Sequence, residues 1–459
     1  MKHRGRYLEV MKRAESGPIV SESEFDMTYI AQKTSELIKK YGIKFNPDQI
    51  INHDDDLADR VFQAGLELIT HSGVFCQDTR RRIVWAENEY LEGLSTAPAE
   101  CTIGQGSDKV NIRARKPEVQ LRPIFGGSPV AVPIQEDQFV PFLLSYAKDP
   151  IFDFLPPPPT LLSAYSVPIK GGSPWEVIAG WRESELTKQV LSAAGRPGMA
   201  VDCVSISTTA AGGISSLSYG GYRPSDRALV SMVAELKTNY DELEKVVHVT
   251  RIDGNMEAFL ASIYGGFLGG YEGLVIGMVA GSIGINQNYM PTTICSSSSH
   301  PLFRSGSSPG TIWTKSLALQ ALTRNASVLM TAMNSTAAGP GTKYILYENV
   351  AQAIAHTVSG ACLIEASLSA HGTNPGHATP LEARIAAEAS IAATEMTRLE
   401  ANEVIGRITK MYESSLTEEN IGKPFHKLYD IDTLEPLPEW TEQYKEVKEE
   451  LRGLGVRIP

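Results

Sequence analysis

The sequence predicts an α/β fold built from parallel βα units. Between about residues 150 and 400, short apolar runs of strand length alternate with longer segments whose apolar residues recur at helical spacing. Parallel strands need a crossover connection, which an intervening helix supplies. Of the 459 residues, 42% are hydrophobic and 21% are charged, which is enough apolar material for a large core. These observations allow a doubly wound sheet or a barrel.

The strands and helices of this region follow from their apolar patterns. The expected strands are 199–207, 246–251, 274–279, 292–295, 328–333 and 361–364. The expected helices are 175–193, 226–243, 310–322 and 343–358. A further helix is expected to begin at Thr379, which forms a capping box with Glu382, and to run toward Ser414.

The first 140 or so residues are expected to form helices followed by short strands. Ser21 and Glu24 form a capping box that opens a helix, and Gly42 ends that helix. The aspartates at 54–56 precede a second amphipathic helix, where they indicate a metal site or, preferably, charge that complements the helix N-terminus. The predicted organisation is an N-terminal extension at 1–144, the βα region at 145–400 and a helical tail at 401–459.

Composition excludes several classes of partner. The net charge of -11 disfavours nucleic acid and anionic membranes, which both reward a basic surface. The basic start of the chain has no apolar core segment, and the longest apolar run, 273–285, is shorter than the roughly 18 residues that span a bilayer. The five cysteines include no Cys-x-x-Cys pair, which fits reduced thiols in a cytoplasm.

Three motifs are weak on inspection. The glycine-rich segment 265–270 lacks the spacing of a phosphate-binding loop and is interpreted as a close-packed turn. His371 and His377 have no third ligand, so no metal site is predicted there. The serines at 296–299 and His300 follow a predicted strand, where they indicate a substrate-contacting loop and not a Ser–His dyad.

Asp202 lies within the apolar run 199–206, and this run begins immediately after the turn at 196–198. A carboxylate inside a protein must be satisfied by a partner, by water or by a cationic ligand. The structural interpretation pairs Asp202 with Arg251 on a neighbouring strand or with backbone amides, and the functional one places it in a binding site. Both interpretations remain open from the residues alone.

The segment AGRPGMAVDCVSIS, at 194–207, resembles the segment of the archaeal monomethylamine corrinoid methyltransferases that contains pyrrolysine. Further segments resemble the same family in the same order: 75–79, 104–113, 136–137, 145–147, 173–177, 264–266, 381–384, 422–425 and 429–430. The resemblance implies a TIM-type (β/α)8 barrel with an N-terminal extension of helices and short strands and a helical C-terminal tail. It also implies a homohexamer, a role in methanogenesis, and a separate corrinoid protein that docks at the barrel mouth.

The residues expected around pyrrolysine differ from the family pattern. By this resemblance Asp202 takes the position of pyrrolysine. The ungapped positions of two glutamates, a glutamine and a tyrosine hold Leu229, Phe259, Met333 and Ser335. An aspartate has no electrophilic imine that could capture an amine, so demethylation of monomethylamine by the family mechanism is not expected.

The expected function is therefore transfer of a methyl group, without pyrrolysine, from a methylated amine to the cobalt(I) of a corrinoid protein, with no tightly bound cofactor in this chain. A quaternary ammonium is the favoured donor, because it leaves as a neutral amine and binds to aromatic residues. Asp202 would supply the counter-charge, and Phe259, Tyr264 and Tyr289 would line the site. The alternatives are a catalytically silent barrel that binds a small ligand or partner protein, and barrel chemistry with Asp202 as general base beside His300.

Overall fold

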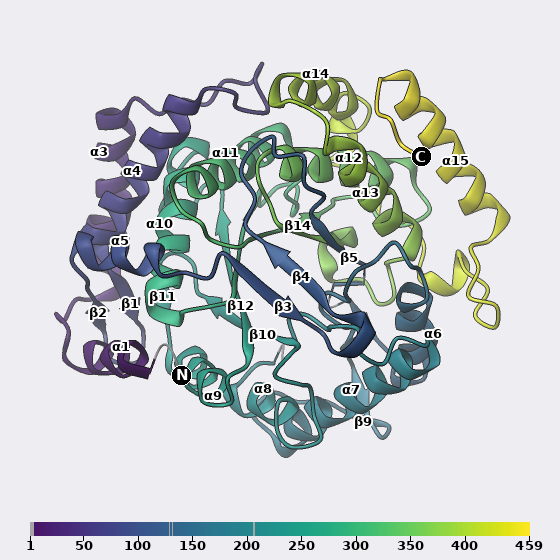
Figure 1. Cartoon of the computed structure of the whole chain (residues 1–459), viewed down its shortest axis with the longest axis horizontal. Coiled ribbons are helices and arrows are strands. Elements are labelled where there is room, and N and C mark those ends of the chain that lie inside the picture. The colour runs from purple at the N-terminus through teal and green to yellow at the C-terminus, as the bar shows by residue number, and fades with distance from the viewer. Residues whose placement is uncertain (1–3, 128, 131, 205–206) are drawn as a thin grey trace.

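The computed structural model describes residues 4–127, 129–130, 132–204 and 207–459, and these form a closed parallel barrel (Figure 1). Six strands pair in the order β10 (Arg227–Met232), β12 (Asn255–Ile263), β13 (Thr293–Ser299), β14 (Met330–Ser335), β15 (Leu363–Leu368) and β5 (Ile124–Gly126). Parallel bridges from Gly126 to Phe154, Leu155 to Val201 and Val204 to Ala228 close the ring through two short segments at 154–155 and 201–204.

A helix follows each of the eight strand segments and packs outside the ring (Figure 1). In chain order these are α6 (Glu136–Ala147), α7 (Pro174–Ala193), α8 (Ala210–Ser216), α9 (Tyr240–Arg251), α10 (Tyr271–Tyr289), α11 (Pro309–Asn325), α12 (Lys343–Val358) and α13 (Pro380–Ala393). Outward-pointing strand residues such as Val230, Leu260 and Ile294 are buried in the main hydrophobic core. The molecule is a TIM-type (β/α)8 barrel.

The N-terminal extension packs on one flank of the barrel, mainly through α4 against α10 (Figure 1). Its elements are α1 (Arg4–Ser16), α2 (Glu22–Glu24), η1 (Phe25–Gln32), α3 (Lys33–Tyr41), α4 (Asp55–Ser72), β1 (Val74–Cys76), β2 (Arg81–Ile83) and α5 (Glu87–Ser95). Strand β1 also pairs with β11 (Lys237–Thr238). Ser21 caps α2 and Gly42 ends α3 in the left-handed conformation, as predicted. Asp54 accepts the Asp56 amide N–H and so caps α4.

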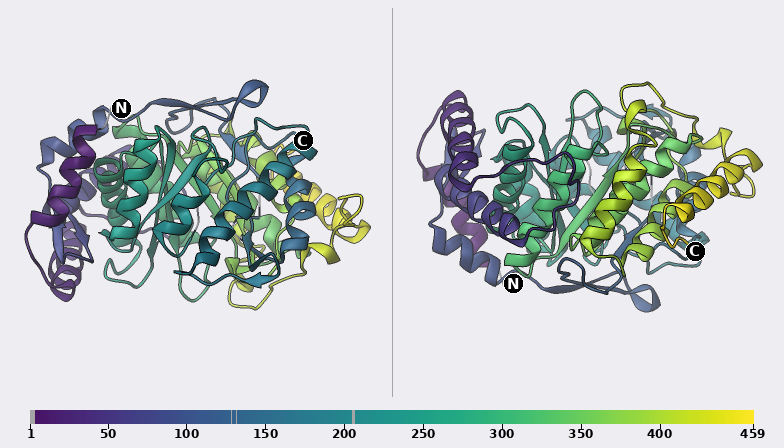
Figure 2. Two further views of the ribbon diagram at one scale, coloured as in Figure 1. Left: turned by 90° about the horizontal axis from the view of Figure 1, so that it is seen from below. Right: turned by 90° about the horizontal axis from the view of Figure 1, so that it is seen from above.

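An antiparallel hairpin of β3 (Glu100–Ile103) and β4 (Val110–Arg113) closes one end of the barrel (Figures 1 and 2). Its Ile103 and Ile112 pack with Leu329 and Cys362, which directly precede β14 and β15. The hairpin therefore covers the amino-terminal end of the strands. Catalytic groups of such barrels gather at the opposite, carboxyl-terminal end.

The C-terminal tail places α14 (Arg398–Thr409) and α15 (Pro438–Gly453) against α12. The remaining short elements are η2 (Gly106–Asp108), β6 (Pro133–Ile134), β7 (Thr160–Leu161), β8 (Ser163–Ala164), β9 (Val167–Pro168), η3 (Ser369–Gly372), η4 (Glu413–Ser415) and η5 (Phe425–Lys427). Over the described residues, no helix combines the length and apolar character needed to cross a bilayer.

Several predicted elements are wrong. Segments 246–251 and 274–279 belong to helices α9 and α10, because an apolar run of strand length cannot be told from a buried helix by its pattern. The helix predicted at 226–243 is β10, β11 and the start of α9. The barrel begins at β5, before residue 145, and the helix after Thr379 ends at Ala393. Residues 205–206 of the strand predicted at 199–207 lie outside the described residues.

Candidate functional site

A buried polar network crosses the barrel interior just above the hairpin, with Arg227 at its centre. The Arg227 guanidinium pairs with Asp202 through Nη2 and donates from Nη1 to Glu257 Oε2 at 2.7 Å. All three side chains are 0% exposed. The predicted pairing of Asp202 with Arg251 is therefore wrong, since Arg251 is an exposed residue at the end of α9.

Each carboxylate of this network has further donors. Glu257 Oε2 also accepts hydrogen bonds from the Thr331 hydroxyl at 2.8 Å and the Thr293 hydroxyl at 3.0 Å. Asp202 Oδ1 accepts the Cys203 amide N–H at 2.7 Å. These contacts satisfy charges that burial would otherwise make very costly. We call the inward residues Asp202, Cys203, Arg227, Glu257, Thr293, Thr331 and Glu365 the buried polar layer.

The layer has an excess of acidic groups. Glu365 Oε1 lies 3.9 Å from Arg227 Nη2, and burial, reinforced by Glu257, raises the pKa of Glu365 well above its ordinary value. Burial, with the nearby carboxyl groups, also raises the pKa of the Cys203 thiol. Asp202, Glu257 and Glu365 thus bring three carboxyl groups to a single guanidinium, that of Arg227. The layer therefore contains more acidic than basic groups.

Four groups of this layer have a geometry that a metal ion could use. One ligand atom from each of Asp202, Cys203, Glu257 and Glu365 lies within 4.8 Å of the others. The Arg227 guanidinium already contacts Asp202 and Glu257 and supplies a cation to them. The close approach of these acidic groups is thus explained by the ion pairs.

An apolar ring lies above the layer, toward the carboxyl ends of the strands. Side chains alternate along a strand, so the inward residues that follow Arg227, Glu257 and Thr331 on their strands are Leu229, Phe259 and Met333. These three side chains are half-buried, whereas the layer beneath them is closed off. We call Leu229, Phe259 and Met333 the apolar ring. On these three strands it lies between the layer and the open end of the barrel.

Aromatic side chains lie at the rim, where β12 and β13 end. The His300 ring stacks on Tyr264, with centroids 4.6 Å apart, and on Phe303 at 4.3 Å. Burial lowers the pKa of His300, so the imidazole is neutral near pH 7. The structure thus brings Tyr264 and His300 together at the mouth. No hydrogen bond joins His300 to Asp202 in the described part of the chain.

Tyr289 does not belong to this site, contrary to expectation. It is the last residue of α10, it is fully buried, and its hydroxyl bonds Thr238 at 2.6 Å, outside the ring of strands. Ser335 has a supporting role: its hydroxyl accepts the Gly306 N–H at 2.7 Å, and Gln352 holds its backbone. Gly265 and Gly269 form a hydrogen-bonded turn, as predicted.

The residues that surround Asp202 were not among the predicted site residues. Arg227 fell inside a predicted helix, and Glu257 lay in a stretch without a predicted element. The signal that could have located them is the alternation of side chains along a strand. Arg227 lies on a six-residue strand and Glu257 on a nine-residue strand, each among alternating apolar residues. A charged residue at an inward position of each strand indicates a shared interior network.

Comparison with known proteins decides the family. A family model described as monomethylamine methyltransferase MtmB matches residues 6–456. The chain belongs to this MtmB family of methyltransferases. MtmB1 and MtmB2 of Methanosarcina acetivorans are 31% and 30% identical to it, and each alignment covers 97% of this chain and 96% of the relative.

Solved MtmB structures share the fold over nearly the whole chain. The crystal structure of the Methanosarcina barkeri monomethylamine methyltransferase superposes with a TM-score of 0.95 at 29% identity, covering 98% of both chains. A complex of MtmB with hydroxylamine matches equally well. The TIM-type barrel predicted from the resemblance is confirmed, and so is the assignment of this protein as a methyltransferase.

Proposed function

We propose that this protein transfers a methyl group from a methylated ammonium compound, preferably a quaternary one, to the cobalt(I) of a separate corrinoid protein. Asp202, by the family resemblance, takes the place of pyrrolysine. One observation carries the proposal: the apolar ring of Leu229, Phe259 and Met333 lies directly above a layer in which three carboxyl groups surround one guanidinium. Methyl groups of a quaternary ammonium would contact the ring, and its charge would face the layer.

The chemistry of the chain's own residues fits such a donor. Phe259 offers a ring face to a cation, a contact worth ~0.5–2 kcal/mol. The carboxylates act across the apolar ring in a medium of low dielectric constant, where charge is screened weakly. A quaternary ammonium releases a neutral amine, so no residue has to protonate or covalently hold the leaving group. The corrinoid of the partner supplies the nucleophilic cobalt.

Asp202 takes a different role from the direct contact expected from sequence. Its side chain is 0% exposed and is paired with Arg227, so the apolar ring lies between it and the mouth. We assign Asp202 as a positioning residue that holds Arg227 and sets the charge of the layer. Phe259, Leu229 and Met333 would form the donor pocket, with Tyr264 and His300 at its rim.

The test mixes the purified protein with a reduced corrinoid protein and one methylated amine at a time, and follows the loss of cobalt(I) absorbance. We expect tetramethylammonium or glycine betaine to support the reaction and monomethylamine to fail. Phe259→Glu should abolish transfer from the quaternary donors, while the exposed control Phe267→Glu should not. Binding of these donors without any transfer would favour a catalytically silent barrel instead.

We further propose a homohexamer in a cytoplasmic compartment. The family model spans residues 6–456 and so includes both extensions, which the resemblance associates with hexamer assembly. All five cysteines are free thiols, which suits a reducing compartment. Light scattering should give about six times the chain mass of 49.9 kDa. A single-chain mass would contradict the assembly.

A further inference from the structure

A cavity of about 330 Å³ lies between α7 and α8, apart from the barrel interior. The segment around β7, with Ser207 and Thr208, completes its wall. Leu161, Ile169 and Ala179 give it an apolar side, while Glu176 and Glu183 bring two carboxyl groups that lie about two turns apart on α7. The described lining includes no lysine, arginine or histidine. The cavity is therefore apolar on one side and acidic on the other.

The two carboxyl groups differ in what they contact. Glu176 is fully engaged: it accepts the Gly172 and Thr209 amide N–H groups at 2.6 and 2.8 Å and the Thr209 hydroxyl at 2.9 Å. These bonds lower the pKa of Glu176 in spite of its burial and keep it ionised. Glu176 thus holds the loop around the cavity and adds a permanent negative charge to it.

Glu183 has hydrogen-bonding capacity to spare. Its Oε1 accepts one hydrogen bond, from the Tyr222 hydroxyl at 2.9 Å, and no donor of the described residues reaches Oε2. Burial raises the pKa of Glu183 to about 7, and the Tyr222 hydrogen bond opposes that rise. A carboxyl group with one free oxygen in a cavity that has no cation of its own is suited to a positively charged hydrogen-bond donor.

Glycines let α7 and α8 pack closely beside the cavity. A Cβ on Gly212 would lie 2.7 Å from Glu176 Cγ, and one on Gly180 would lie 2.8 Å from Ser215 Oγ. A Cβ at either position would clash with the facing atoms, so the close approach of α7 and α8 requires glycine there. The cavity therefore lies beside a tight helix contact that fixes its wall.

We propose that this cavity binds a small organic ammonium ion that has at least one N–H group, through Glu183. The ammonium donates to the free Glu183 oxygen, and its apolar portion contacts Leu161, Ile169 and Ala179. The site goes beyond the proposed methyl transfer and does not depend on it. A quaternary ammonium, which has no N–H group, is excluded from the hydrogen bond.

The test measures binding to the full-length protein by calorimetry, with benzylammonium, benzyl alcohol and benzyltrimethylammonium as probes. We expect benzylammonium to bind at least tenfold more tightly than the other two at pH 8. Glu183→Gln should lose at least tenfold in benzylammonium affinity. The matched control Glu185→Gln, an exposed residue on the same helix, should lose less than twofold.

The pH dependence gives a second readout. The titratable groups near Glu183 are Glu176 and Tyr222. The facing helix α8 contains no titratable residue, and Arg182 is paired with Glu136. Because Glu183 must be ionised to bind a cation, affinity should rise from pH 6 to pH 8 in the wild type and stay flat in Glu183→Gln. Equal binding of benzylammonium by both proteins, or no binding to the folded wild type at 10 mM probe (roughly the weakest affinity that calorimetry detects), would overturn the proposal.

Discussion

Two networks of arginine and carboxylate groups tie this molecule together in opposite surroundings. In the buried polar layer, Arg227, Asp202 and Glu257 are 0% exposed, and they join strand segments in the barrel interior. Water reaches none of them. Every charge of this network is therefore compensated only by the other members and by hydroxyl and amide donors beside them.

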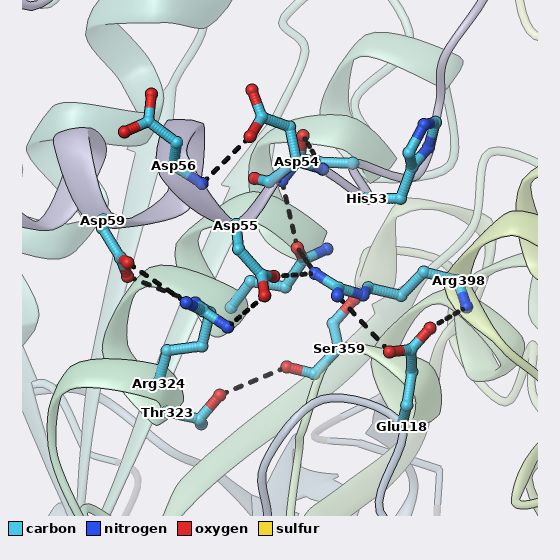
Figure 3. Close-up of polar contacts among 12 residues, drawn as sticks. His53, Asp54, Asp55, Asp56, Asp59, Glu118, Thr323, Arg324, Ser359 and Arg398 are labelled. Atoms are coloured by element: carbon cyan, nitrogen blue, oxygen red, sulfur yellow. Dashed lines mark hydrogen bonds and ion pairs between the residues drawn. The ribbon is translucent and has the colours of Figure 1, made fainter.

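The second network joins the extension to the barrel helix α11 and the tail helix α14 at the surface (Figure 3). Asp55, at the start of α4, pairs with Arg324 of α11 at 2.7 Å and with Arg398 of α14 at 2.8 Å. Arg324 also holds Asp59, and Arg398 holds Glu118. Asp55 is 48% exposed and Arg324 is 26% exposed, so water solvates these two charges whether or not they are paired. Arg398, at 9% exposed, is the buried member of this network.

An arginine–carboxylate pair therefore contributes differently to the free energy of unfolding in the two surroundings. Removing one partner of a buried pair leaves a charge that water cannot reach, at a cost of about 3–5 kcal/mol. An exposed pair contributes ~0.2–1 kcal/mol, because each partner regains its hydration when the other is lost. The predictions below test this difference, from the largest expected effect to the smallest.

Arg227→Met should lower the free energy of unfolding by about 3–5 kcal/mol, because it strands Asp202 and Glu257 without a cation. Urea unfolding followed by circular dichroism measures the change. The exposed control Arg251→Met should stay within about 0.5 kcal/mol of the wild type. Adding Asp202→Asn and Glu257→Gln to Arg227→Met should recover much of the loss, and a loss below 1 kcal/mol in the single variant (roughly that of a surface pair) would contradict the interpretation.

Asp202→Asn should cost about 1–3 kcal/mol of stability, because Arg227 keeps Glu257 but loses one of its two close carboxylates. The same variant should bind a quaternary ammonium more weakly, since the layer loses one of its three carboxyl groups. Thermal melts with and without glycine betaine separate the two effects. A variant as stable as the wild type, with unchanged ligand stabilisation, would show that Asp202 matters to neither.

Glu365→Gln should change the pH dependence of stability. The folded protein raises the pKa of Glu365, so above the ordinary glutamate pKa of about 4.3 the folded state holds a proton that the unfolded state has released. Stability is therefore lost as pH rises through this window, by up to about 1.4 kcal/mol per pH unit. The variant should lack that loss and exceed the wild type in stability at pH 8 but not at pH 4. Stability-versus-pH curves that run parallel for the wild type and Glu365→Gln would contradict this prediction.

Arg324→Gln should cost only ~0.2–1 kcal/mol at low salt, and 1 M NaCl should remove most of that difference. Urea unfolding at the two salt concentrations gives the measurement. The cost of Arg227→Met should be the same at both concentrations, because ions do not enter the barrel interior. A salt-sensitive Arg227→Met, or a salt-insensitive Arg324→Gln, would remove the distinction between the networks.

Local sequence signals located much of the fold. The cap at Thr379 and Glu382, the cap at Ser21 and the helix at 343–358 were predicted from residues close together in the chain, and each is present. The run at 274–279 has the pattern of a strand because α10 is buried on almost every side. It therefore has no polar face that would reveal the 3.6-residue spacing of a helix. Burial by neighbours cannot be inferred from such a segment alone.

The sequence by itself determined the alternation of strands and helices, the acidic character and, through its resemblance, the family and the barrel. It also indicated that Asp202 needs a partner, because a buried carboxylate is costly wherever it lies. Only the tertiary structure decided that the partner is Arg227 and that Phe259 lies above the layer. The reason is that both contacts join strands distant in sequence, and closure of the barrel sets which inward residues meet.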